Sequence, residues 1–520
     1  MTGDKKIGFW EAFSIGVGGM VGGGIFAVLG LTIALAKGAA PISFAIAGFI
    51  ALITAYSYVK LSIRYPSEGG TIEFITQAFG NNMFSSIVNT LMLFSYVIML
   101  ALYSYAFGSY GSALFTDGEN PALQKIFISG VIALFILINL AGAFLTGKAE
   151  DLLVLIKVLI LMGFIILGFF TAKYQRLSPK YYESTIKIVT GGLIIFLAYE
   201  GFELIANTAK DIKKPRRTLP KAFYGSVIFV IILYILVAVV TIANVSFAQA
   251  QKAQEYVLAI AAEPFLGHAG FVIIAIAALI STASAINATI YGGGRVSYLI
   301  AKYGELPQIF GKQIKAGYEG MIIIGLLATI FATTFNLKNI SIAGSVGFLI
   351  IFGLVNYANF KLYKQTESNR WISLLGAITC ALATIVLIGY NYSKDPSSLI
   401  SVAVVLISIV LFEYVYNLYK EKKLQPVIDP VLKLREDLLK DFLSLAPTVK
   451  EKVSVHAPNA QVYAAISQHP EIDNRPKIYI VDKTLTDKEK EKIKKDLGQD
   501  FEVIFTKNKQ DIEHVAQKVE

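Results

Sequence analysis

Three ionisable side chains lie within apolar stretches of the sequence, where charged groups are uncommon. Lys157 interrupts the run LLVLIKVLILMGF, and Glu200 and Glu203 lie on either side of Gly201. Ionisable groups inside a membrane are costly and favour a functional interpretation. Either carboxylate could bind a proton, and Glu200 could face a bound solute and favour a cation. The alternatives are that Lys157 extends to the aqueous surface, and that the carboxylates point into a water-filled vestibule or pair with basic side chains.

Glycines are concentrated in the first apolar run. The segment GVGGMVGGGIF, residues 16–26, contains six glycines among its 11 residues. Glycine costs about 1 kcal/mol relative to alanine inside a helix, so this segment predicts a helix that breaks at mid-membrane depth, where the freed backbone groups must line a cavity. The second half-helix, beginning near Gly22, would face an anionic group, and the carbonyls near Gly18 and Val21 would face a cation. The alternative is a glycine-rich face for close helix packing.

Other residues that often carry chemistry form no pattern. The four histidines have no metal-ligand spacing, so neither a metal site nor a cofactor is expected. The glycines of YGGGRVSY, residues 291–298, do not form a phosphate loop, because no strand precedes them and no Gly-Lys-Ser/Thr follows. The single cysteine, Cys380, excludes a disulfide framework within the chain. Without a catalytic constellation, an enzyme is not expected.

The apolar residues cluster into runs of about 20, long enough to cross a bilayer. Of the 520 residues, 55% are hydrophobic and 16% are charged, which is typical of an integral membrane protein. The first run is too long for a cleavable signal peptide. Twelve spans are predicted at about residues 9–36, 41–63, 84–113, 127–144, 152–171, 190–207, 222–243, 271–302, 321–335, 340–361, 371–390 and 399–416. Between them, residues 64–80 are expected to form a polar connection and residues 248–268 a short helix outside the membrane.

The loop charges predict the orientation. Residues 210–221, KDIKKPRRTLPK, form the densest basic loop of the membrane part, and basic loops favour the cytoplasmic side. Twelve crossings place both termini on that side of the cell membrane. The basic residues between spans 5 and 6 run against this statistical rule. Because much of the net charge of +10 lies in short loops beside membrane spans, it does not indicate a protein that binds nucleic acid.

The character of the chain changes after residue 416. Residues 420–520 are rich in Lys, Glu and Asp and have no spanning run. Strands are predicted at 476–482 and from Phe501, and helices at 430–445, 486–497 and 511–519. This order predicts a small α/β lobe on a parallel sheet, following a transmembrane domain at 1–419. The lobe is expected to be cytoplasmic, either as a regulatory element that binds a small ligand or protein or as a trafficking or stability appendage.

A second interruption occurs in span 6. The segment GGLIIFLAYEGFE, residues 191–203, places glycines on either side of FLAY. Paired interruptions five spans apart are the sequence sign of an inverted-repeat transporter. The expected architecture is an all-α membrane domain of twelve helices in a five-plus-five repeat with broken helices 1 and 6. Repeat one covers about 9–171, repeat two about 190–361, and helices 11 and 12 about 371–416.

Four segments resemble the amino acid–polyamine–organocation transporter superfamily, which has the leucine-transporter fold. They are GGMVGGGIF (18–26), the stretch from Tyr56 through PSEGG to Gly80, LAYEGFELIANTAKDIKKPRRTLPKA (197–222), and ALISTASAINATIYGGGRVSYLIAKYGELP (278–307). The resemblance covers about residues 7–416 and implies a transporter of amino acids or amines that works by alternating access. Two departures, Lys60 and Lys210–Asp211, stand where relatives carry acidic residues, and they concern gating contacts more than the fold.

The resemblance also implies site residues. The substrate carboxylate would rest on the backbone N–H groups at the start of the second half-helix, at Gly22, Gly23, Gly24 and Ile25. The substrate ammonium would meet the carbonyls of Phe196, Leu197 and Ala198, beside Tyr199 and Glu200. Tyr199 and Phe202 are the expected gates. Tyr103, a further gating candidate, belongs to an aromatic stripe in span 3 that either packs the core or walls the site.

In some sodium-independent relatives a lysine replaces the coupling sodium ion, and Lys157 falls at that position. Its ammonium would lie near the Gly18 and Val21 carbonyls and the hydroxyls of Ser281 or Ser284. The resulting hypothesis is proton-coupled, sodium-independent uptake with Lys157 as proton carrier and Glu203 as a second titrating group. The alternatives are an exchanger of amino acids or amines and a transporter-like nutrient sensor that signals through the C-terminal lobe. The oligomeric state is left open.

Overall fold

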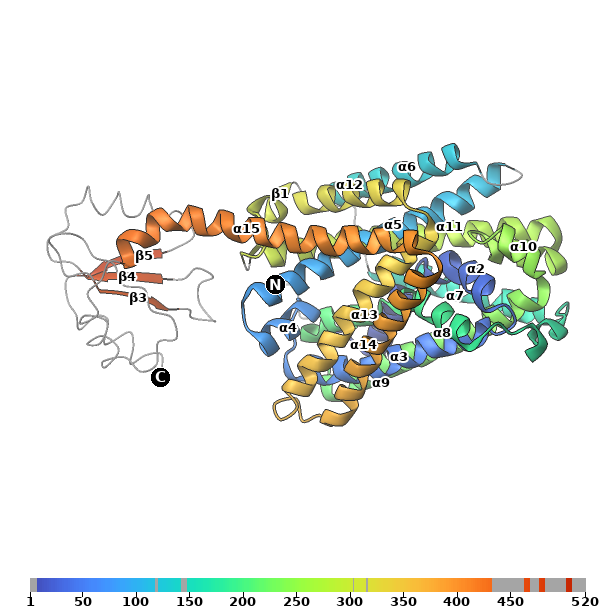
Figure 1. The fold of residues 1–520 in the computed structure, drawn as a ribbon, viewed down its shortest axis with the longest axis horizontal. Coiled ribbons are helices and arrows are strands. Elements are labelled where there is room, and N and C mark those ends of the chain that lie inside the picture. The colour runs from blue at the N-terminus through green and yellow to red at the C-terminus, as the bar shows by residue number, and fades with distance from the viewer. Residues whose placement is uncertain are drawn as a thin grey trace. The chain divides into compact units, whose positions relative to one another are not determined.

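The computed structural model describes residues 7–116, 120–141, 147–302, 304–314 and 317–432, together with three strand segments at 463–467, 477–481 and 502–506. The chain divides into two compact units, residues 1–413 and 414–520. The described part of the first unit is built almost entirely from helices (Figure 1).

The described residues contain nine helices that are long and apolar enough to cross a membrane. Two further pairs of short helices pass the same test together, each bent at a break, and raise the number to eleven. The chain is therefore a multi-pass membrane protein. The nine long helices are α3 (Ala40–Arg64), α5 (Met83–Phe115), α6 (Pro121–Leu140), α7 (Gly147–Phe169), α9 (Pro215–Asn244), α11 (Val257–Lys302), α13 (Leu337–Lys361), α14 (Arg370–Lys394) and α15 (Ile400–Leu432).

The predicted ninth span corresponds to a shorter apolar helix. This helix, α12 (Glu319–Thr334), has 16 residues and follows a two-stranded antiparallel pair, β1 (Gln313–Ile314) and β2 (Gly317–Tyr318). Other short elements are α10 (Phe247–Lys252) and the 3₁₀ turns η1 (Tyr174–Leu177), η2 (Pro179–Tyr181), η5 (Gln308–Gly311) and η6 (Pro396–Leu399).

The structure refines two predictions for the segments between the spans. The polar connection at 64–80 contains a buried helix, α4 (Thr71–Phe79), whose apolar face packs into the core through residues such as Phe74. The single helix expected at 248–268 is divided, because α10 ends at Lys252 and α11 already begins at Val257. At Gly267, α11 takes a left-handed conformation with φ of 61°, which separates its first turns from the membrane-spanning part.

Local sequence explains where the long helices begin. Asn82, Asn120 and Asn336 each accept a hydrogen bond from a backbone N–H in the first turn of the helix that follows. Among the nine long helices, α5 is the most deeply buried, with 89% of its apolar window buried, whereas the window of α6 is 22% buried. The face of α6 that the protein leaves uncovered is apolar and suits lipid. Cys380 on α14 is fully buried, with its Sγ 3.9 Å from the Thr54 Oγ1 atom.

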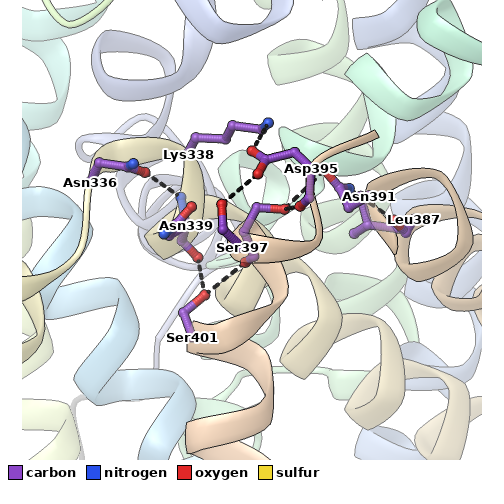
Figure 2. Close-up of polar contacts among 9 residues, drawn as sticks. Asn336, Lys338, Asn339, Leu387, Asn391, Asp395, Ser397 and Ser401 are labelled. Carbon is purple, nitrogen blue, oxygen red and sulfur yellow. Dashed lines mark hydrogen bonds and ion pairs between the residues drawn. The ribbon is translucent and has the colours of Figure 1, made fainter. Parts of the chain in front are cut away.

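A polar cluster ties the start of α13 to the turn between α14 and α15 (Figure 2). Lys338 Nζ lies 2.7 Å from Asp395 Oδ2, and the Ser401 hydroxyl donates to the Asn339 carbonyl at 2.9 Å. Asn391, at the end of α14, accepts a hydrogen bond from Ser398. The bonded Lys338 ammonium holds the pKa of the Asp395 carboxyl below its ordinary value, helped by the Ser397 hydroxyl. One end of α13 is thus fastened to its neighbours, and Figure 1 places α13 and α14 side by side.

Replacing Asp395 by asparagine should lower the unfolding temperature slightly at neutral pH, because both partners are about one-third exposed and such pairs contribute less than about 1 kcal/mol. A lowered carboxylate pKa stabilises the fold above the ordinary pKa of the group, and this contribution disappears as the pH falls through the lowered value. The difference between native protein and D395N in a thermal melt should therefore vanish in strongly acidic buffer. In the double variant with Lys338→Met the losses should not add; additive losses would contradict the ion pair.

The described part of the second unit is a three-stranded sheet in the order β3 (Tyr463–Ser467), β4 (Lys477–Val481) and β5 (Glu502–Thr506). Strands β4 and β5 lie within the ranges predicted as strands and pair in parallel, with Tyr479 opposite Ile504. Strand β3 was not predicted from the sequence, and it pairs antiparallel with β4. The helices predicted at 486–497 and 511–519, and most of the one at 430–445, lie outside the described residues.

Candidate functional site

The first apolar run breaks where its glycines predict. Helix α1 (Phe9–Met20) and helix α2 (Gly24–Ala36) meet at a bend of 45°. The second half-helix begins at Gly24, two residues later than expected. Its first helical hydrogen bond runs from the Ala27 N–H to the Gly23 carbonyl. The N–H groups of the preceding helical residues have no partner within the helix. These buried donors make the start of α2 suited to an anion.

The second break lies in span 6, as predicted. Helix α8 (Thr185–Ile194) is followed by two 3₁₀ segments, η3 (Phe196–Tyr199) and η4 (Phe202–Asp211), with a bend of 47°. The chain therefore continues as 3₁₀ turns rather than as a second α-helix. At the join Gly201 has φ of 112°, in the left-handed region. The predicted site residues Phe196, Leu197, Ala198, Tyr199 and Phe202 are all buried.

The two breaks touch each other. A Cβ atom added to Gly19 would lie 2.7 Å from the carbonyl oxygen of Gly201, and one added to Gly24 would lie 2.8 Å from the Cα of Ala198. Only glycine, which has no Cβ atom, allows two backbones to approach so closely. The ring of Tyr103 lies against Gly23 from the other side. The structure thus brings the glycines of the first break together with the interrupted part of span 6 and one aromatic residue of span 3.

Backbone bridges also join the outer ends of the two broken spans. Ile7 donates to the Asp211 carbonyl at 2.8 Å, and its own carbonyl accepts from the Lys213 N–H at 2.9 Å. At the other end Lys37 forms an antiparallel bridge with Tyr182. Beside that bridge Glu183 lies 2.7 Å from the Lys37 ammonium and 2.9 Å from that of Lys187. Spans 1 and 6 are held together at both ends and in the middle.

Side chains from other spans bind the carbonyls freed at the end of α1. Lys157 on α7 donates to the Gly18 carbonyl at 3.1 Å, and its side chain is almost completely buried. Ser281 on α11 donates to the Val21 carbonyl at 3.0 Å and also to that of Gly22. Within the described residues no hydrogen bond joins the half-buried Ser284 to these carbonyls. Lys157 therefore points into the break rather than to the aqueous surface, and Ser281 is the α11 hydroxyl that reaches it.

The two carboxyl groups of span 6 are buried within the protein. Glu203 is 1% exposed and accepts the Gly201 N–H at 2.7 Å through Oε2. Glu200 is 6% exposed. Its carboxyl group lies beside the carboxyl group of Glu203 and the phenol of Tyr103. The burial of both side chains does not fit the alternative that they point into an open vestibule. Two neighbouring buried carboxyl groups can share one proton.

The two expected gates occupy different surroundings. The Tyr199 hydroxyl donates to the Phe44 carbonyl on α3 at 2.9 Å. Phe202 belongs to an aromatic cluster, with ring centroids 5.4 Å from Tyr58 and 5.3 Å from Phe352. The ring of Tyr58 contacts aromatic residues of four other elements and so lies at the centre of this cluster. Tyr58 was not predicted from the sequence as a functional residue.

Two further residues that the sequence did not single out bind the breaks directly. The hydroxyl of Tyr234 on α9 donates to the Met20 carbonyl at 2.6 Å and lies 3.3 Å from the Ala198 carbonyl. Ser345 on α13 accepts the Leu197 N–H at 3.3 Å and donates to the Ile194 carbonyl at 2.8 Å. Both lie in apolar runs, where a lone hydroxyl resembles ordinary packing. The only signal was that a buried hydroxyl needs a hydrogen-bond partner.

Known proteins resemble this chain over most of its length. An uncharacterized protein of Methanocaldococcus jannaschii is 34% identical over 80% of this chain and 96% of its own. The inner membrane transport protein YbaT of Escherichia coli is 32% identical over 75% of this chain and 91% of its own. The branched-chain amino acid permease BcaP of Bacillus subtilis is 23% identical over 69% and 81%.

A solved structure supports the leucine-transporter-like fold. The manganese transporter of Eremococcus coleocola superposes with a TM-score of 0.52 at 14% identity, covering 79% of this chain and 94% of its own. At that identity the similarity concerns the fold alone. The family model described as amino acid permease matches residues 7–412. The chain therefore belongs to the amino acid permease family, and it is a transporter of amino acids or related organic solutes rather than an enzyme.

Proposed function

We propose that this protein carries an amino acid into the cell by alternating access, in symport with protons and without sodium. The observation that carries the proposal is the bond from the Lys157 ammonium to the Gly18 carbonyl at 3.1 Å, in the break of span 1. The carbonyl end of α1 attracts a cation, and a lysine fixed there supplies that cation from the protein. A sodium ion is then not needed to complete the site.

Proton exchange at Lys157 would change how firmly α7 holds α1. A charged ammonium is drawn to the carbonyl end of a helix and donates a strong hydrogen bond, whereas a neutral amine does so weakly. Val154, one turn earlier on α7, packs against Gly18, since a Cβ added there would lie 2.7 Å from its Cγ2 atom. Protonation at Lys157 and the position of α1 are therefore coupled through one contact. The Glu200–Glu203 pair is the second place where a proton can be held.

The substrate would bind between the two breaks. Its carboxylate would rest at the start of α2, on the N–H groups of Gly22, Gly23, Gly24 and Ile25. Its ammonium would meet the carbonyls of Phe196, Leu197 and Ala198, while Tyr103, Tyr199 and Glu200 would border its side chain. The close approach of Gly24 to Ala198 supports this arrangement, because it brings the donor end of one break to the carbonyls of the other.

The proposal includes twelve crossings with both termini in the cytoplasm. Lys60 at the end of α3 donates to the Glu367 carbonyl after α13 at 2.8 Å, so these two positions lie on one side of the membrane. An even number of spans must separate them. Seven of the spans between them are α5, α6, α7, the broken span 6, α9, α11 and α13, so α12 is needed as the eighth. This count supports α12 as a short ninth span. The proposal also keeps a membrane domain at 1–419 followed by a cytoplasmic lobe at 420–520.

Purified protein in sodium-free liposomes should accumulate a labelled amino acid when the outside is made acidic. A sodium gradient without a pH gradient should give no accumulation. Exchange would instead be indicated if uptake required preloaded internal substrate. Sodium-driven uptake that ignores the pH gradient would contradict the proposal.

A further inference from the structure

Tyr234 is the described side chain whose hydroxyl is within hydrogen-bond distance of both broken spans. It lies on α9 and is fully buried. Its oxygen is 2.6 Å from the Met20 carbonyl in span 1 and 3.3 Å from the Ala198 carbonyl in span 6. A hydroxyl has one hydrogen to donate. The two carbonyls therefore share this hydrogen, with the stronger bond to Met20 and the weaker one to Ala198.

The ring of Tyr234 is held in place from two sides. Its centroid lies 5.8 Å from the ring of Phe44 on α3 and 5.3 Å from the ring of Tyr199 in span 6. The Tyr199 hydroxyl in turn donates to the Phe44 carbonyl at 2.9 Å. Because α3 and α9 pack along each other, the phenol projects from a fixed support to the contact between the breaks.

We propose that Tyr234 is a positioning residue for the substrate ammonium, an inference that rests on the proposed function. In the empty site its hydroxyl bonds the Met20 carbonyl and restrains the Ala198 carbonyl. When an amino acid binds, its ammonium takes the Ala198 carbonyl and the tyrosine hydrogen turns fully to Met20. The phenol thus holds the Ala198 carbonyl at the distance from the N–H groups of α2 that separates the ammonium and the carboxylate of an amino acid. The pair of breaks then selects zwitterions in which amine and carboxylate share one carbon.

Replacing Tyr234 by phenylalanine removes the hydroxyl and keeps the ring. The matched control is Tyr110→Phe, because Tyr110 is also fully buried and donates to a span 1 carbonyl, that of Phe26, at 3.2 Å, but from α5. Both variants should lose similar thermal stability in detergent, since each removes one buried hydrogen bond from a tyrosine hydroxyl to a backbone carbonyl. Only Tyr234→Phe should raise the KM for the transported amino acid, by about tenfold, with a smaller change in maximal rate.

The decisive measurement compares the KM for the amino acid with the inhibition constant of its analogue without the amino group. The preference for the amine-bearing compound should shrink in Tyr234→Phe and persist in Tyr110→Phe. Equal KM changes in both variants, no change in Tyr234→Phe, or tighter binding in it would overturn the positioning role. If the native protein transports no amino acid at all, the proposed function fails instead, and the two failures are told apart in the same assay.

Discussion

Replacing Lys157 by alanine should abolish proton-driven accumulation of substrate while leaving substrate binding measurable. The Lys157 side chain is 2% exposed and donates to the Gly18 carbonyl at 3.1 Å. Removing it leaves a buried carbonyl without this charged donor, which typically costs about 1.5–3 kcal/mol, or tenfold and more in an equilibrium. Accumulation in liposomes under an inward proton gradient should fall by at least about tenfold. Downhill exchange of labelled for unlabelled substrate should persist at a reduced rate.

Ser281→Ala is the matched control for the Lys157 variant. Ser281 binds the neighbouring Val21 carbonyl at 3.0 Å, so this variant also removes a hydrogen bond from the break. It removes no ionisable group. We expect weaker binding in Ser281→Ala but an uptake that still rises with the pH gradient. If Lys157→Ala continued to accumulate substrate against its gradient in response to pH, the lysine would not be the proton carrier.

Replacing Gly201 by alanine should strongly damage both the fold and transport. Gly201 has φ of 112°, a region that costs other residues about 1–2 kcal/mol. Its new Cβ would lie 2.6 Å from the Met20 backbone nitrogen, so the two broken spans would have to separate. Overpacking of this kind adds about 1–3 kcal/mol. Thermal melts should shift down by several degrees, and transport should fall by at least about tenfold.

Gly163→Ala on α7 provides the control, because nothing lies within 4 Å of a Cβ added there. Alanine favours helix over glycine by about 1 kcal/mol, so Gly163→Ala should be neutral or slightly stabilising. Gly19→Ala should reproduce the damage of Gly201→Ala, since its Cβ would lie 2.7 Å from the Gly201 carbonyl oxygen. A Gly201→Ala protein with native stability and transport would show that the two backbones are not pressed together.

The positions of the breaks were predictable because glycine content is local information. The six glycines of 16–26 indicated the first break, and the structure moves the start of the second half-helix only from Gly22 to Gly24. The side chains of other spans that hydrogen-bond the backbone at the breaks could not be predicted from hydrophobic periodicity. Tyr234 and Ser345 lie in apolar runs of other spans, and their roles depend on how α9 and α13 pack.

The errors outside the site have similar causes. The connection at 64–80 reads as a loop because of its paired glycines and polar residues, yet Thr71–Phe79 forms a helix that buries one face. Tertiary packing decides such short amphipathic segments. Strand β3 contains YAAIS, which lacks clear alternation and includes two alanines of low strand propensity. The prediction for Lys157 depended on a resemblance, and its bond to the Gly18 carbonyl could be seen only once α7 was placed against α1.

The burial of Cys380 makes this protein convenient for spectroscopy. The only thiol in the sequence is enclosed where α3, α13 and α14 meet, so thiol-reactive spin labels should leave the native chain unmodified. Cysteines introduced in pairs on either side of the Ile7–Ile212 bridge could then be labelled without first removing a native one. Interlabel distances measured in acidic and neutral vesicles would follow the opening of the transport cycle directly.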